Sequence, residues 1–429
     1  MHHHTLFLSL HLTWLLFVFA LGACVGSLTN VLVYRLPRGK DVIFETSRCP
    51  SCNHELSMWR ENVPILGWLV LRGRCRYCKA KISPEYIIVE LVVALLFAGV
   101  WALWYVLPNA DSFGMEPFAY LQPEWAANGW KHTWPIAIVM FTLLGSLVAV
   151  TLVDARTFHI PLVLVWVPTV VAIVGHVGWA AWHGPLRHTA EGAIWAIPTP
   201  PVGPLQWAWI GGAVGASAGL LFSNVMVWAG LLGRSFADYD AWEREQLKAK
   251  GYDPDTVEPE QLGEDAAVWL EYPHARREMI REIVFLLPAM AFGVLGAALA
   301  NRFWGGQEAV PFWLDVAGGV ALGIIVGGGL VWAVRILGTL AFGKEAMGLG
   351  DVHLMAAVGA AIGWIDPILA FFAACVFGAV WGGVGRLFGG AKVLPFGPYL
   401  AVGTVLVMVF KPVFELGLAR MLHAPIDLP

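Results

Sequence analysis

Charged residues are the scarcest class in this sequence. Asp, Glu, Lys and Arg make up 14% of its 429 residues, against about a quarter in soluble domains. Hydrophobic residues reach 58%, with 22 tryptophans among them. So little charge excludes an ordinary soluble domain. The net charge of −4 says little about partners, because the charges are segregated along the chain. We expect a lipid bilayer as partner and no nucleic acid.

Cysteine is also rare, with 6 in the whole chain. Four of them form two Cys-x-x-Cys pairs, Cys49 with Cys52 and Cys75 with Cys78. Paired units at this separation predict a four-thiolate, tetrahedral zinc site. Redox-active pairs are the alternative, although no thioredoxin-like sequence surrounds them. A segment this short cannot bury a core of its own, so a metal ion would help it to fold.

Long apolar runs dominate the rest of the chain. A helix that crosses a bilayer needs about 20 apolar residues. The eighth run is short and could begin with Asp351 itself. The first run, 6–26, could alternatively be a signal peptide, but the basic segment after it favours a retained anchor. We predict an all-α polytopic membrane protein with about 8–10 transmembrane helices and a small cytoplasmic four-cysteine module. The ten candidate spans are 6–26, 86–107, 134–153, 161–182, 206–232, 283–301, 312–338, 352–366, 368–388 and 396–418.

Basic residues gather in one loop. The segment 35–84 holds 10 Lys and Arg residues, whereas the loops 108–133, 183–205 and 302–311 hold 1 each. Basic loops stay in the cytoplasm, so 35–84 is predicted to be cytoplasmic. Counting alternate crossings from there places the polar, acidic loop 233–282, Asp154 and Asp351 on the same side. One miscounted span would reverse this result.

Two aspartates lie where apolar runs meet loops. Asp351 closes a Gly-Leu-Gly-Asp sequence that contains Gly348 and Gly350, and Asp154 ends an earlier run shortly before Pro161. Such an aspartate can be a simple helix N-cap, or an ion relay in a transporter. An ionisable group at the membrane boundary more often marks a functional site. Two carboxylates at matching depth are what an aspartyl protease needs, since they share one proton and activate water.

The residues around Asp351 are further candidates for the site. Glycines at 348 and 350 would let a substrate backbone approach closely. We interpret Lys344 and Glu345 as an ordinary interfacial pair, with a role in the site as the alternative. His353 could tune the carboxylates, but a packing or interfacial role is more typical there. The substrate's apolar helix could be held by glycine-rich spans, such as the one containing 318–319 and 327–329.

These motifs together resemble bacterial type IV prepilin peptidases. The N-terminal half of that family is matched by Gly26–Gly39 (Gly-Ser-Leu-Thr-Asn-Val-Leu-Val-Tyr-Arg-Leu-Pro-Arg-Gly), by both cysteine pairs, and by Val89-Glu90. The peptidase half is matched by Asp154 with Ile160-Pro161, by Gly343–Asp351 (Gly-Lys-Glu-Ala-Met-Gly-Leu-Gly-Asp), and by Pro395-Phe-Gly-Pro398. The motifs occur in the family's order from residue 22 to residue 400.

The resemblance implies a bifunctional enzyme of the bacterial inner membrane. It would remove the basic leader of prepilins or pseudopilins on the cytoplasmic side, next to their apolar helix. It would then methylate the new N-terminus with S-adenosylmethionine. The family's catalytic aspartates correspond to Asp154 and Asp351, without an assignment of the base. A protease of the Gly-x-Gly-Asp type that cuts other membrane proteins is the alternative.

The chain also departs from the family pattern. Leu162 stands where the family often has Asp, and His353 stands where it often has Lys, which puts the substrate preference in doubt. Two extra candidate spans and the acidic loop look like an insertion at 206–301. The predicted parts are a first transmembrane helix (1–34), the four-cysteine module (35–84), a membrane region with the first aspartate (85–205), the insertion (206–301) and a membrane region with the second aspartate (302–429).

Overall fold

The computed structural model describes most of the chain, and most of what it describes is helical. Within these residues there is no β-strand, only two isolated antiparallel bridges, Arg48–Glu55 and Arg74–Lys81. The described residues are 2–57, 60–109, 121–127, 129–187, 198–201, 203–257, 259–262, 272–305, 310–387 and 395–423.

Nine of the described helices are long and apolar enough to cross a membrane. The predicted all-α polytopic fold is therefore confirmed. Helix α13 has only 14 residues and would extend about 21 Å, which is less than the ~30 Å of a hydrocarbon core. The elements are α1 (His2–Arg35), η1 (Leu36–Arg38), α2 (Leu66–Val70), α3 (Glu85–Trp101), η2 (Ala102–Val106), η3 (Leu107–Asn109), α4 (Glu124–Ala127), α5 (Trp130–Thr157), α6 (Leu162–Ala172), η6 (Ile173–Val177), α7 (Gly178–Arg187), α8 (Gln206–Trp228), α9 (Tyr239–Ala249), α10 (Pro259–Leu262), α11 (Ala275–Trp304), α12 (Phe312–Phe342), α13 (Leu349–Ile362), α14 (Asp366–Leu387) and α15 (Gly397–Leu422).

The start of α11 differs from the sequence prediction. The helix begins at Ala275, within the predicted loop 233–282. Its first turns are polar, but Glu278 is fully buried between Arg277 at 2.8 Å and Arg281 at 3.0 Å. This paired carboxylate lets the helix continue beyond its apolar span. The predicted loops 108–133 and 233–282 lie partly outside the described residues.

The contacts divide the chain into two compact units. Unit 1 comprises Met1–His132 and Leu144–Leu152, and unit 2 comprises Thr133–Leu143 and Val153–Pro429. The five parts predicted from sequence remain predictions.

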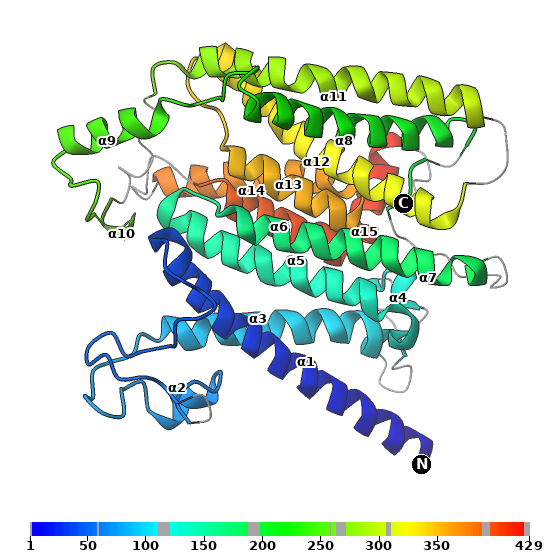
Figure 1. Ribbon diagram of the computed structural model, residues 1–429. Helices are drawn as coiled ribbons and strands as arrows, with labels where there is room; N and C mark the ends of the chain where they lie inside the picture. Colours follow the sequence, from blue (N-terminus) through cyan, green and yellow to red (C-terminus); the bar gives the residue numbers. More distant parts are fainter. Residues whose placement is uncertain are drawn as a thin grey trace. The chain divides into compact units, whose positions relative to one another are not determined.

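Helices α1 and α3 form the core of unit 1, and Figure 1 shows them crossing. Their backbones approach closely at Gly26, where an added Cβ would lie 2.6 Å from the Cα of Glu90. The buried Glu90 accepts a hydrogen bond of 2.6 Å from the backbone N–H of Ile65. At the end of α1, Arg35 donates to the carbonyls of Asp41 (3.0 Å) and Glu45 (2.7 Å). Both helices therefore hold the four-cysteine segment directly.

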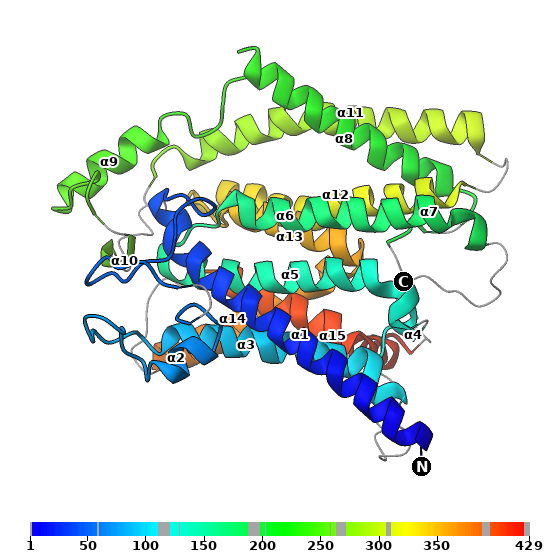
Figure 2. The ribbon, with the colours of Figure 1, turned by 60° about the horizontal axis from the view of Figure 1, so that its bottom comes forward.

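Unit 2 contains pairs of closely packed helices. In both ribbon views α8 lies beside α11, and α12 lies beside α13 (Figures 1 and 2). Gly323 of α12 faces the backbone of Gly359 of α13, where neither position has room for a Cβ. Such close approach lets a short helix be held along its length by its neighbour.

The space beside most of the glycines proposed to hold a substrate helix is filled by the chain itself, whereas nothing lies within 4 Å of a Cβ at Gly329. An added Cβ at Gly318 would lie 2.8 Å from Ile210 of α8, and one at Gly328 would lie 3.1 Å from Ala356 of α13. Gly327 faces the backbone of α13 at Met355 in the same way. That prediction was wrong for these positions because small residues serve any close helix pair, whether within one chain or between two.

Candidate active site

Asp154 lies one turn before the end of α5 and is 5% exposed. Its Oδ2 atom accepts a hydrogen bond of 3.0 Å from the backbone N–H of Gly397, the first residue of α15. A Cβ at Gly397 would lie 2.6 Å from the same oxygen, so a side chain at this position would have to displace the carboxylate. The start of a helix offers free N–H groups and a positive dipole end, which both suit a carboxylate.

Asp351 is the third residue of α13 and is 7% exposed. It is not the N-cap, a position that Gly348 occupies. Its Oδ2 atom accepts a hydrogen bond of 3.2 Å from the N–H of Gly348. The capping interpretation is therefore correct in part, since the carboxylate satisfies one helix amide while its other oxygen keeps its acceptor capacity.

The side chain of Ile160 connects the surroundings of the two aspartates. A Cβ at Gly350 would lie 2.8 Å from Ile160 Cβ, and a Cβ at Gly397 would lie 3.3 Å from Ile160 Cδ1. Ile160 thus touches both the residue before Asp351 and the residue that binds Asp154. The two carboxyl groups are near enough for the charge of Asp154 to act on Asp351. Both lie within unit 2, so the structure brings the predicted pair together.

Lys344 and Glu345 do not behave as one interfacial pair. Lys344 is exposed, whereas Glu345 has a side chain only 10% exposed and forms an ion pair with Arg335 of α12. Burial raises the pKa of Glu345, while the guanidinium of Arg335 opposes that rise. Arg335 was not predicted from the sequence, although a lone arginine in an apolar run was an available signal.

His353 and Leu162 mark the two departures from the family pattern. The Nδ1 atom of His353 lies 2.8 Å from the carbonyl oxygen of Leu349, one turn back along its own helix. Its ring is therefore held on α13 itself. Leu162, in the first turn of α6, is 49% exposed.

The four cysteines form a second site, in unit 1. Each pair lies in a tight turn, in which the N–H of Cys49 or Cys75 donates over 2.9 Å to the carbonyl that closes the turn. The residue after each second cysteine, Asn53 or Lys79, has a left-handed backbone with φ of 56° or 58°. The two turns therefore have the same hydrogen-bond pattern and the same left-handed residue.

The four sulfur atoms converge on one point. All lie within 4.8 Å of one another, with 3.8 Å between Cys49 and Cys78 and 4.0 Å between Cys52 and Cys75. Backbone N–H groups of Cys52 and then Ser51 lower the pKa of Cys49 to about 7. A hydrogen bond from the backbone of His54 lowers the pKa of Cys52, but burial and hydrogen bonds with the other thiols outweigh it and raise that pKa to about 11, so without a metal ion the thiols do not ionise together. All four thiols are free of disulfides. The residues fit a metal ion held by four thiolates.

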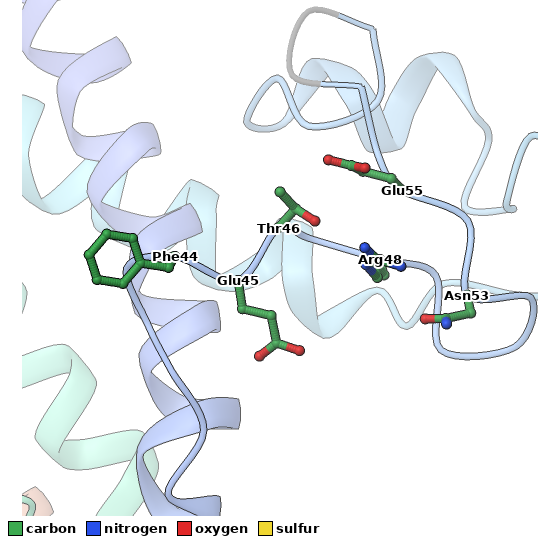
Figure 3. Close-up of a pocket in the computed structure, with 6 residues that line it drawn as sticks. All are labelled: Phe44, Glu45, Thr46, Arg48, Asn53 and Glu55. Carbon is green, nitrogen blue, oxygen red and sulfur yellow. The ribbon is translucent and has the colours of Figure 1, made fainter.

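A polar pocket adjoins the first cysteine turn (Figure 3). Its volume is about 510 Å³. It is lined by Phe44, Glu45, Thr46, Arg48, Asn53 and Glu55. With charges of both signs and one aromatic ring, this pocket suits a small polar ligand better than an apolar one.

Two family models match the chain. The bacterial Peptidase A24 N-terminal domain matches residues 20–104, and the type IV leader peptidase family matches residues 279–383. These two stretches of the chain are similar to the type IV leader peptidase family, and each model covers less than half of the chain. The first match contains all four cysteines. The second contains Asp351 but not Asp154, and it begins inside the predicted insertion 206–301.

Curated members of the leader peptidase family show the same relationship. A prepilin leader peptidase/N-methyltransferase of Myxococcus xanthus is 51% identical over 81 residues, which is 19% of this chain and 24% of the relative. One of Klebsiella pneumoniae is 41% identical over 107 residues, or 24% and 46% of the two chains. A type 4 prepilin-like proteins leader peptide-processing enzyme of Escherichia coli is 28% identical over 239 residues, or 49% and 75%.

The chain thus spans less than half the length of the first two of these relatives. No solved structure matches the chain.

Proposed function

We propose that this protein is a membrane-embedded aspartic endopeptidase that removes the leader peptide of type IV prepilins or pseudopilins. The observation that carries the proposal is the meeting of Asp154 and Asp351 around Ile160, each held by a backbone N–H. Similarity to the type IV leader peptidase family and the names of the relatives support the substrate class.

The chemistry follows from the buried carboxyl pair. Two like charges close together in a low dielectric cannot both ionise at little cost, so one carboxyl keeps its proton. The ionised partner takes a proton from water, whose oxygen attacks the scissile carbonyl. The protonated partner first hydrogen-bonds the carbonyl oxygen, and a proton then passes to the departing amine as the C–N bond breaks. Asp154 and Asp351 can exchange these roles, and we assign neither as the base.

The substrate would combine a basic leader with an apolar helix. A prepilin would keep its apolar helix in the bilayer and present the cleavage site at the membrane boundary. Asp154, near the end of α5, and Asp351, near the start of α13, both lie next to loops, which suits cleavage at such a boundary.

We place the active site at the cytoplasmic face of the bacterial inner membrane. The 10 basic residues of 35–84 support this orientation. Cysteine-accessibility labelling should find 233–282 in the cytoplasm and 108–133 outside. Labelling of 233–282 from outside would contradict the orientation.

The metal that we propose for the cysteine site is zinc. Four thiolates around a zinc ion, with bonds of about 2.3 Å, lie about 3.8 Å apart, close to the sulfur separations of 3.8 and 4.0 Å. With all four positions filled by Cys49, Cys52, Cys75 and Cys78, the ion would stabilise the segment and leave no place for a catalytic water.

A second activity, N-methylation with S-adenosylmethionine, is also proposed. It is supported by the relatives' names, which include N-methyltransferase. We assign no residue to it.

Incubation of the purified protein with a prepilin, followed by mass spectrometry of the product's N-terminus, tests both activities. We expect a leader removed after a glycine, and one added methyl group when S-adenosylmethionine is supplied. An intact prepilin would overturn the peptidase proposal. Cleavage without methylation would overturn only the second activity.

A further inference from the structure

Arg335 is an almost fully buried cation about two turns before the end of the apolar helix α12. It is 1% exposed, and a charge in such a place must be paired to be tolerated. Its partners come from two directions. Its Nη2 atom lies 3.1 Å from Glu282 of α11, and its Nη1 atom binds both the carboxylate of Glu345 and the carbonyl oxygen of Met347.

Glu282 is buried as well and accepts a second hydrogen bond. It is 4% exposed and also accepts a hydrogen bond of 2.6 Å from Trp332 Nε1. The ring of Phe236 lies over the guanidinium, 5.3 Å from its central carbon, and helps to exclude water. Both Glu282 and Phe236 belong to 206–301, the stretch that the sequence analysis interpreted as an insertion.

The other end of this network is the loop that carries the site. Residues 343–348 connect α12 to α13, and Thr339 Oγ1 accepts a 3.0 Å hydrogen bond from the N–H of Ala346. Arg335 fixes the same loop at Glu345 and Met347. The next residue, Gly348, donates its N–H to Asp351. The carbonyl of Met347 and the N–H of Gly348 belong to one peptide unit, so Arg335 and Asp351 bind the two ends of the same peptide group.

We propose that Arg335, braced by Glu282, is a positioning residue that sets the place of Asp351 through the loop 343–348. The segment 206–301 then contributes to the active site, because it supplies the carboxylate that holds Arg335. The role in catalysis rests on the proposed function, whereas the role in ordering the loop does not.

Two readouts test this proposal in the full-length protein in detergent. The first is the rate of prepilin cleavage, separated into kcat and KM. Arg335→Met should lower kcat about 10²-fold, since a misplacement of about 1 Å costs that much, and should change KM far less. Arg335→Lys should recover only part of the loss. Lysine keeps the positive charge, but one ammonium cannot bind Glu282, Glu345 and a carbonyl in the same fork geometry. Glu282→Gln should lower kcat about tenfold.

The second readout is amide hydrogen exchange of residues 343–350. It should quicken in Arg335→Lys and Glu282→Gln, whether or not the protein cleaves prepilins. If the wild-type protein does not cleave prepilins, the proposed function is wrong. The exchange rates then test by themselves whether Arg335 and Glu282 order the loop 343–348.

Asp315→Asn is the matched control. Asp315 is also buried in α12 and also binds the segment 206–301, through a 2.8 Å hydrogen bond from Gln206, but it lies in the first turn of α12, at the opposite end of the helix from the loop 343–348. It should leave kcat and the loop's exchange within about twofold of wild type. If Arg335→Met does not fold, Glu282→Gln and Arg335→Lys still test the proposal. Normal kcat and normal exchange in those two variants, or equal effects in Asp315→Asn, would overturn the proposal.

Discussion

The cysteine module and the aspartate site are built in opposite ways. In the module each turn closes on itself, with Cys49 and Cys75 bound to carbonyls a few residues further along the chain. In the aspartate site, the hydrogen bond between Gly397 and Asp154 joins residues 243 positions apart. Local hydrogen bonds shape the first, together with the metal that we propose there, whereas packed helices shape the second. The two regions should therefore fail for different reasons.

The largest loss of cleavage is expected from substitutions that remove a carboxylate without changing the packing. Asp154→Asn and Asp351→Asn should each lower prepilin cleavage by about 10²- to 10⁴-fold, because an amide cannot hold or pass the proton. Each asparagine keeps the size of the side chain and can accept the same backbone hydrogen bond. Mass spectrometry of the product measures cleavage, and elemental analysis should find the metal content unchanged.

Near-normal cleavage by either variant would remove that residue from the pair. Loss of folded protein in detergent, or loss of metal, would show that the cysteine module and the aspartate site depend on each other.

A smaller effect comes from displacing Asp154 without changing it. A Cβ at Gly397 would lie 2.6 Å from Asp154 Oδ2, so Gly397→Ala must push the carboxylate away from its position. We expect a loss of kcat of about 10²-fold, from misplacement by about 1 Å. Gly417→Ala is the control on the same helix, since nothing lies within 4 Å of a Cβ there. Equal activity of the two variants would show that Asp154 is not held by α15.

The same contrast explains what the sequence could predict. The spacing of Cys49, Cys52, Cys75 and Cys78 predicted their convergence because turn geometry is local. Asp154 and Asp351 were found because each lies at the edge of an apolar run, and the apolar runs also predicted the helices. Their meeting could only be expected from matching depth, since no local signal shows which helices pack together.

What the sequence could not show is the partner of each buried group. Arg335 and Glu282 lie 53 positions apart, and a lone charge in an apolar run does not say what it binds. Four of the five α12 glycines, all but Gly329, were misassigned to a substrate for the same reason. Residue type predicts close packing at Gly327, but only the fold shows that α13 fills the place.

Metal removal should act on the module far more than on the aspartate site. We expect Cys75→Ser, or chelation, to abolish metal binding, because four thiolates must be present at once. The segment 35–84 should then exchange its amides faster, as happens where a metal supplies the folding energy. Prepilin cleavage should fall no more than about tenfold, through loss of the segment's position. Cys24→Ser, an exposed thiol in α1, is the control.

Elemental analysis should find about one zinc per chain in the wild type and in Cys24→Ser. A disulfide between the pairs in place of the metal would contradict the metal site. Complete loss of cleavage, with N-methylation retained on a pilin supplied without its leader, would show that the module serves the peptidase reaction and not the other one.

The smallest effect is expected at His353, which lies close to Asp351 in sequence but belongs to neither region's network. Its Nδ1 atom bonds the carbonyl of Leu349 within α13, so the ring is held by its own helix and not by a carboxylate. His353→Ala should therefore change kcat by about twofold or less, the size typical of substitutions away from buried networks. His353→Lys, which restores the residue common in the family, should change KM for a prepilin with a basic leader more than it changes kcat, because a cation would repel the leader. A drop in kcat for His353→Ala as large as that of Gly397→Ala would place the imidazole among the groups that act on the reacting peptide. The aspartate site would then extend one turn further along α13 than its hydrogen bonds indicate.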